Sequence, residues 1–157
     1  MSRSQLEQAL GAIPSGLFIL TIGTGTRATG MLASWVMQAG FEPPSLTVAI
    51  NQSRYVADWL TAQQPFNLNL VGEGQTGLLK HFGKGFEPDA PAFEGLAFKP
   101  CKRGVPILAE AIGHLECEPT CHADSGDHRI FVARVVRGKF QPDSASMVHI
   151  RKSGGRY

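Results

Sequence analysis

The segment Asn51-Gln52-Ser53-Arg54 carries an amide, a hydroxyl and a guanidinium where a predicted strand leads into a predicted helix. The first turn of a helix presents free N–H groups and the positive end of the helix dipole, so it can hold a phosphate. Ser53 would add a hydroxyl donor and Arg54 a two-pronged, charge-assisted contact. The alternative is a capped surface helix with a solvated arginine, and the segment by itself favours that simpler interpretation.

A second segment, Gly30-Met31-Leu32-Ala33-Ser34-Trp35, places a glycine before small and hydroxyl residues on a predicted strand. Because glycine has no side chain, a flat ligand can approach the backbone closely at such a position. The alternative is ordinary strand packing, in which Trp35 fills the core. Both interpretations stay open at this point.

Two other patterns suggest chemistry that their spacing argues against. The glycines of Gly23-x-Gly25-x-x-x-x-Gly30 depart from the dinucleotide-binding fingerprint, whose third glycine follows the second by three residues and opens a helix. A strand is predicted after Gly30, so a hairpin turn is the better interpretation. Cys117, Cys121 and the nearby histidines form one loose cluster, whereas a zinc site needs two well-spaced pairs. We therefore expect no metal site.

Helix signals occupy three short stretches that would position these residues. Ser4 and Glu7 have the spacing of a capping box, which predicts a helix over residues 4–12. Helical periodicity predicts a second helix over residues 54–63, with Ser53 as its cap, and a third around residues 78–82.

Strand signals cover more of the chain than helix signals. In residues 66–70, apolar side chains alternate with Asn67 and Asn69, which is typical of a strand. Residues 83–106 form a long connection rich in glycine and proline, a candidate site-covering loop. We expect a mainly β fold with peripheral helices, built as a closed or partly closed antiparallel barrel. Its other strands are expected over residues 17–22, 30–38, 46–50, 114–118 and 130–136, with turns at residues 23–26 and 126–127.

Length and composition fit one globular domain over residues 1–157. A net charge of +2 without a long run of like charge does not indicate nucleic acid. The longest apolar run, residues 17–22, is far shorter than the ~20 residues of a membrane helix. We expect no signal peptide, and three cysteines without framework spacing favour free thiols in a reducing cytoplasm.

Five short segments follow one another along most of the chain. They are Gly30-Met31-Leu32-Ala33-Ser34-Trp35, Pro43-Pro44, Ser53-Arg54, Phe66-Asn67-Leu68-Asn69-Leu70 and Gly126-Asp127-His128. In this order they resemble the flavin reductase-like family of FMN-binding split-barrel proteins, from Leu10 to about Phe140. The variant Leu32-Ala33-Ser34-Trp35 and the final residues, 149–157, look most like the C-terminal reductase module of cyanobacterial flavodiiron (diflavin) proteins. The chain would be such a module or its free-standing relative.

The resemblance implies an antiparallel Greek-key split barrel that forms a homodimer and binds FMN near the subunit interface. It also implies an oxidoreductase that passes a hydride from NADH or NADPH to flavin N5. His128 would lie beside the flavin ring where the nicotinamide docks, and a positioning role is expected for it. The residues carried over as cofactor-binding are Met31, Leu32, Ala33, Ser34 and Trp35 at the ring, Asn51, Ser53 and Arg54 at the phosphate, and Lys80, His81 and Phe82 at the ribityl or phosphate end.

Two positions depart from the family pattern, because many members carry threonine in place of Leu32 and serine in place of Trp35. Two hydrogen bonds to the flavin would be lost, and Trp35 would instead shield the ring by stacking. One alternative function is an FMN-holding electron-transfer module that a partner protein reduces in place of NAD(P)H. Another is a structural dimerisation domain that binds no flavin.

Overall fold

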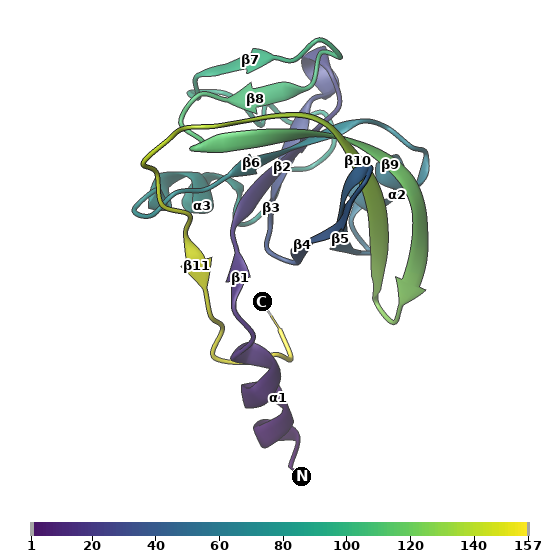
Figure 1. Cartoon of the computed structure of the whole chain (residues 1–157), viewed down its shortest axis with the longest axis vertical. Coiled ribbons are helices and arrows are strands. Elements are labelled where there is room, and N and C mark those ends of the chain that lie inside the picture. The colour runs from purple at the N-terminus through teal and green to yellow at the C-terminus, as the bar shows by residue number, and fades with distance from the viewer. Residues whose placement is uncertain (1, 157) are drawn as a thin grey trace.

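A computed structural model describes residues 2–156 of the chain (Figure 1). The helices are α1 (Arg3–Gly11), α2 (Tyr55–Thr61) and α3 (Thr76–Phe82), with a 3-10 turn at Gly25–Arg27. The expected mainly β fold with peripheral helices is confirmed. The strands are β1 (Ser15–Gly16), β2 (Phe18–Ile22), β3 (Thr29–Ala33), β4 (Val36–Phe41), β5 (Pro44–Asn51), β6 (Phe66–Leu70), β7 (Phe98–Pro100), β8 (Pro106–Leu108), β9 (Gly113–Ser125), β10 (His128–Phe140) and β11 (Val148–His149).

One seven-stranded antiparallel sheet organises the molecule, in the order β3-β2-β6-β9-β10-β5-β4. Its two edge strands, β3 and β4, are consecutive in the chain and are joined by Ser34 and Trp35 alone. Three Cα–Cα steps span at most ~11 Å, so the end of β3 lies close to the start of β4. The sheet therefore curls until its edges approach at that point (Figure 1), while no ladder of the described residues joins β3 to β4.

The single strand predicted over residues 30–38 is wrong, because the chain forms two strands there, β3 and β4. β3 pairs with β2, whereas β4 pairs with β5. The chain changes partner at Ser34 and Trp35, where the Trp35 carbonyl accepts a hydrogen bond from Ala49 N at 3.0 Å. Neither glycine nor proline marks the change of partner, so the sequence gives no local signal of it.

The core lies on both faces of β6. Asn67 and Asn69 face away from its apolar residues, as their alternation predicts, yet both are buried as well. Asn69 accepts a hydrogen bond from Leu108 N at 2.9 Å and donates one to the Ile19 carbonyl at 3.0 Å. Asn67 donates to the Val105 carbonyl at 3.2 Å. The two amides thus fasten the segment around β8 to the sheet.

The helix α1 stands away from the sheet, beside the C-terminal segment (Figure 1). Its capping box consists of Ser2 and Gln5, so the box predicted from Ser4 and Glu7 is wrong. Ser2 Oγ accepts the Gln5 N–H at 3.2 Å, and the Gln5 side chain accepts the Ser2 N–H at 3.3 Å. Both pairs have the same spacing, and Glu7 forms an ion pair with Arg3 at 2.9 Å instead.

The strands β9 and β10 form a long hairpin whose turn is Gly126-Asp127, as predicted. Ser125 pairs with His128 across that turn, and Gly126 adopts a φ of +60° that favours glycine. Both strands extend beyond the predicted ranges. The prediction was too short because the second half of each strand is largely exposed and lacks an apolar alternation.

None of the helices within residues 2–156 is both long and apolar enough to cross a membrane. Over the same residues, no three His, Cys, Asp or Glu side chains gather into a group suited to a metal ion. The cysteines are free thiols: Cys117 is buried and Cys121 is exposed. Burial raises the pKa of the Cys117 thiol to about 12, because the thiolate would lose its hydration.

Thiol labelling of the folded protein should therefore separate the cysteines. We expect Cys121 to react first with a disulfide reagent at pH 8, and Cys117 to react only after unfolding, because the thiolate is the reactive form. Absorbance of the released thiolate gives the rates, and Cys121→Ser should remove the fast phase. Rapid labelling of Cys117 in the folded chain would contradict its burial.

Candidate functional site

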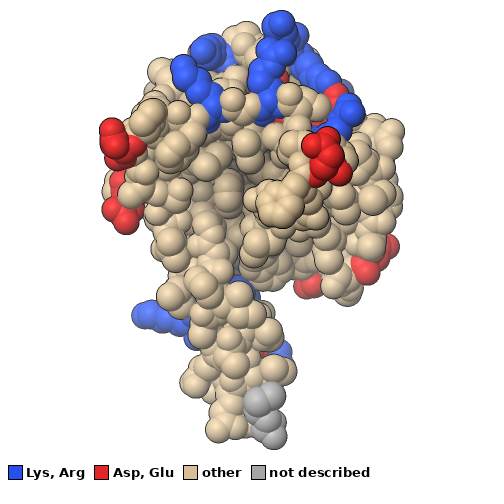
Figure 2. Space-filling view, in the orientation of Figure 1, with Lys and Arg blue, Asp and Glu red and all other residues tan. Residues whose placement is uncertain are grey.

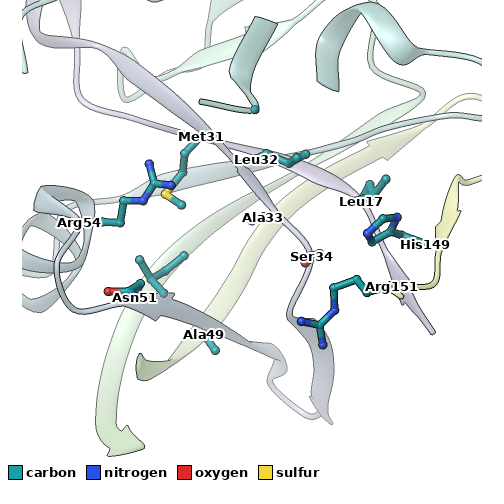
Figure 3. Close-up of a pocket in the computed structure, with 12 residues that line it drawn as sticks. Leu17, Met31, Leu32, Ala33, Ser34, Ala49, Asn51, Arg54, His149 and Arg151 are labelled. Atoms are coloured by element: carbon teal, nitrogen blue, oxygen red, sulfur yellow. The ribbon is translucent and has the colours of Figure 1, made fainter. Parts of the chain in front are cut away.

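A cavity of about 210 Å³ opens where the sheet is not closed, between β3 and β5. β3 and the residue after it form one wall, and the end of β5 with the start of the following segment forms the other (Figure 3). The C-terminal segment supplies the remaining polar side chains. The lining residues are Leu17, Met31, Leu32, Ala33, Ser34, Ala49, Ile50, Asn51, Arg54, Gly83, His149 and Arg151.

Positive charge dominates this cavity. Arg54 and Arg151 lie on opposite sides of it, with the β3 wall between them (Figure 3), and the lining includes no carboxylate. Neither arginine forms an ion pair with a carboxylate of residues 2–156. Gly85 leaves room for the Arg54 side chain, since a Cβ there would lie 2.6 Å from Arg54 Nη1. Two cations without nearby anions suit a negatively charged ligand.

The segment from Asn51 to Arg54 differs locally from its prediction. α2 begins at Tyr55, and its N-cap is Arg54, which makes no side-chain cap, so Ser53 is not the cap. The Ser53 hydroxyl donates instead to Asn51 Oδ1 at 2.7 Å, and the Ser53 N–H donates to the same oxygen at 2.9 Å. Asn51 and Arg54 line the cavity, whereas Ser53 is exposed beside it.

Four consecutive residues of the second segment, Met31, Leu32, Ala33 and Ser34, line the cavity. Gly30 does not line it. A Cβ at Gly30 would lie 2.7 Å from Cε1 of Phe82, whose side chain is fully buried. The glycine therefore admits an aromatic ring of α3 against β3, and its interpretation as a point of ligand approach is wrong.

Trp35 lies behind this wall, among charged and polar side chains. Its ring centroid is 4.7 Å from that of His128, and the guanidinium of Arg151 lies 5.0 Å from its centroid. Trp35 is half-buried and borders a separate groove between β4 and the α1–β1 segment, so it neither fills the core nor lines the cavity directly.

His128 begins β10 and is largely buried. Its Nδ1 lies 2.7 Å from Asp127 Oδ1, and this hydrogen bond, together with the charge of the imidazole, lowers the pKa of the Asp127 carboxyl. The Gln52 side chain donates to the His128 carbonyl at 3.2 Å. His128 does not line the cavity. Its ring contacts Trp35, and Trp35 in turn contacts Arg151, which does line the cavity.

The α3 residues carried over by resemblance lie away from the cavity lining. Phe82 is in the core, Lys80 is exposed, and His81 Nε2 lies 2.7 Å from the Ala92 carbonyl. The residue after them, Gly83, does line the cavity. Gly83 is the one residue of the connection 83–106 in the cavity lining, and Gly85 of the same connection lies against the Arg54 side chain. A site-covering role for this connection stays a prediction.

His149 and Arg151 are cavity residues that the sequence did not assign to the site. β11 pairs with β1, with His149 opposite Ser15, and this pairing brings the C-terminal segment to the cavity. The Arg151 N–H then donates to the Gly11 carbonyl at 3.0 Å. The sequence signals at this place were the basic residues Arg151 and Lys152 and the family resemblance of residues 149–157.

The family model for the flavin reductase like domain matches residues 10–155. The chain belongs to this family. It is 39% identical over 156 residues to diflavin flavoprotein A 1 of Synechocystis sp., a match that covers 98% of this chain and 27% of that protein. The chain thus spans about a quarter of the length of the curated relatives it matches.

Solved structures agree with the family assignment. The NADH:FAD oxidoreductase of Streptomyces globisporus C-1027 superposes with a TM-score of 0.85 at 27% identity, over 99% of this chain and 90% of that one. A second structure of that protein is a complex with NAD and FAD fragments. The styrene monooxygenase flavin reductase of Pseudomonas putida S12 has a TM-score of 0.76 at 26% identity, over 96% and 93% of the chains. The domain accordingly shares the fold of these two flavin reductases.

Substituting Gly30→Ala should destabilise the fold, because the added methyl group meets the buried Phe82 ring. Overpacking of this kind costs about 1–3 kcal/mol, so the melting temperature should fall by several degrees. Gly77→Ala is the matched control: a Cβ there meets nothing within 4 Å, and alanine favours the helix α3. Equal melting temperatures for Gly30→Ala and the wild type would contradict this packing role.

Proposed function

We propose that the chain is an NAD(P)H:flavin oxidoreductase that binds FMN in the cavity between β3 and β5. The observation that carries the proposal is a cavity with an arginine on each side and no carboxylate in its lining, in a chain of the flavin reductase family. FMN, when bound, accepts a hydride at N5 and so supplies the redox chemistry itself. The protein residues bind and orient the two substrates.

The donor set of the cavity suits FMN. Arg54 would bind the phosphate through charge-assisted hydrogen bonds, and Asn51 and the neighbouring Ser53 hydroxyl would add polar contacts. The chain offers one arginine at that end and no second phosphate loop, which favours FMN over FAD. The Streptomyces globisporus protein is named an NADH:FAD oxidoreductase. The preference for FMN is therefore proposed for this chain and is not taken from that protein.

The β3 wall would bind the flavin ring. β3 is an edge strand that pairs with β2 on one side, so its outer N–H and C=O groups face the open side of the sheet. Such N–H groups would donate to N5 and O4 of the ring without help from particular side chains. The cavity encloses about 210 Å³, below the ~300 Å³ lower bound of typical ligand sites, so part of a bound FMN would extend outside it.

His128 would act as a positioning residue for the nicotinamide. Its ring packs on Trp35 and is oriented by Asp127, so it stands at the rim of the site without lining the cavity. Hydride transfer to N5 needs no proton from an imidazole beforehand. The expected contribution is therefore the orientation of the donor ring.

A second copy of the chain is proposed as a partner. An apolar groove between β4 and α1 borders Trp35 and Arg151, and Met37 and Val148, which also line it, are 68% and 67% exposed. Covering this groove would remove apolar surface from water and would place the partner next to the flavin cavity. This supports the homodimer that the family resemblance implies.

An alternative function is electron transfer without NAD(P)H, in which a partner protein or domain reduces the FMN. Its support is the length of the diflavin relatives, which extend well beyond the matched region. Figure 2 also shows Lys and Arg side chains gathered at the end of the molecule that carries β7 and β8, where Lys99, Lys102 and Arg103 are exposed. Such a surface suits an acidic protein partner.

Arg54→Ala should weaken FMN binding and leave the fold intact. Loss of a charge-assisted contact costs about 1.5–3 kcal/mol, which is about ten- to a hundredfold in the dissociation constant. Quenching of flavin fluorescence on titration measures it. Lys84→Ala is the matched control, since Lys84 is exposed nearby and does not line the cavity. An equal affinity of wild type and Arg54→Ala would place the phosphate elsewhere, and a wild-type chain that takes up no FMN would support the structural alternative.

His128→Ala should slow reduction by NADH or NADPH more than it weakens FMN binding. The loss should stay below the ~100-fold that removal of a general acid commonly costs, because orientation alone is affected. Stopped-flow bleaching of the bound flavin gives the rate, with His122→Ala as a control on an exposed histidine of β9. No bleaching of the wild type by either nucleotide would favour reduction by a partner protein.

A further inference from the structure

Arg151 occupies a place in the cavity that phosphate binding by Arg54 does not explain. Figure 3 shows the two guanidinium groups on opposite sides, with the β3 residues Met31 to Ser34 between them. A phosphate bound by Arg54 leaves Arg151 at the far end of the β3 wall. Arg151 also borders the exposed groove beside β4, so it separates that groove from the cavity.

The guanidinium of Arg151 contacts an aromatic ring and a backbone carbonyl. The guanidinium carbon lies 5.0 Å from the centroid of the Trp35 ring, a cation–π contact. Nη1 donates a long hydrogen bond of 3.4 Å to the Arg156 carbonyl. Within residues 2–156 no carboxylate forms an ion pair with Arg151, so its charge is not neutralised locally by a described side chain.

The backbone around Arg151 is fixed against α1 by close contacts. The Arg151 carbonyl oxygen lies 2.7 Å from the position that a Cβ on Gly11 would take. Three residues later, Gly154 N donates to the Glu7 carbonyl at 2.6 Å, and a Cβ on Gly154 would collide with Leu10. The C-terminal segment therefore needs both glycines to pack on α1, and this packing holds the arginine at the cavity.

We propose that Arg151 raises the reduction potential of the bound flavin by stabilising the negative charge that the ring gains on reduction. The inference rests on the proposed FMN site. A hydride carries two electrons and one proton from the nicotinamide to N5, so a neutral ring becomes an anion and the nicotinamide becomes a cation. With the phosphate at Arg54, the ring lies along β3 and Arg151 is the cation at its other end.

A shift of the reduction potential corresponds to a difference between the affinities of the protein for reduced and for oxidised FMN. A fixed cation interacts weakly with the neutral oxidised ring and strongly with the anionic reduced ring. Removing the charge should weaken binding of reduced FMN about tenfold more than that of oxidised FMN. For a two-electron couple a tenfold change in this ratio lowers the midpoint potential by ~30 mV.

The test compares Arg151→Gln, Arg151→Lys and Lys152→Gln, each loaded with FMN. Lys152 is the matched control, because it is the next residue, carries the same charge, is exposed and does not line the cavity. Equilibration with a reference dye at constant pH gives the midpoint potential, and fluorescence titration gives the affinity for oxidised FMN. We expect a fall of ~30 mV in Arg151→Gln, a smaller fall in Arg151→Lys, and none in Lys152→Gln.

A second variant moves Arg151 without removing it. Gly11→Ala places a methyl group against the Arg151 carbonyl, so it should displace the segment and lower the potential in the same direction. Arg151→Gln with tight FMN binding and a wild-type potential would overturn the inference while leaving the FMN site intact. Equal falls in Arg151→Gln and Lys152→Gln would also overturn it. A wild-type chain that binds no FMN would overturn both this inference and the proposed function.

Discussion

The two-residue link between β3 and β4 is the constraint on which the rest of the structure depends. Two strands at opposite edges of a seven-stranded sheet cannot be joined by Ser34 and Trp35 unless the sheet curls on itself. The curl brings the edges together at one end of β3 and leaves them apart along its length. The cavity opens beside this gap, between β3 and β5, so the β3 edge of the sheet lines a cavity.

The same link decides which side chains meet around that cavity. Trp35 is held at the point where the edges meet, and from there its ring contacts both His128 and Arg151. His128 and Arg151 are far apart in the sequence, and Trp35 contacts both from behind the β3 wall. A change at Trp35 would therefore act on the proposed nicotinamide side, at His128, and on Arg151 together, although Trp35 does not line the cavity.

Local signals predicted much of this architecture, and contacts distant in sequence explain what they missed. The alternation at Asn67 and Asn69 and the turn at Gly126 are properties of a few neighbouring residues, and both were predictable. The role of Gly30 depends on Phe82 from another element, and the cap role of Ser53 was lost to a hydrogen bond with Asn51. The spacing of apolar and polar residues along the sequence does not predict such side-chain pairs.

The position of Arg151 was the least predictable part of the site, because it depends on three separate contacts of the C-terminal segment. The pairing of β11 with β1, the Gly11 carbonyl and the close packing of Gly154 each bring a late residue against an early one.

The departure from the family pattern at Leu32 concerns a side chain, whereas the proposed ring contacts come from the backbone of β3. The β3 wall presents backbone groups of an edge strand, so the side chain of Leu32 can differ from threonine without removing the N–H donors. Charge at the two ends of the cavity comes from side chains, and there no backbone group can replace Arg54 or Arg151. In the proposed flavin site, a change of the Leu32 side chain is therefore tolerated far better than loss of either arginine.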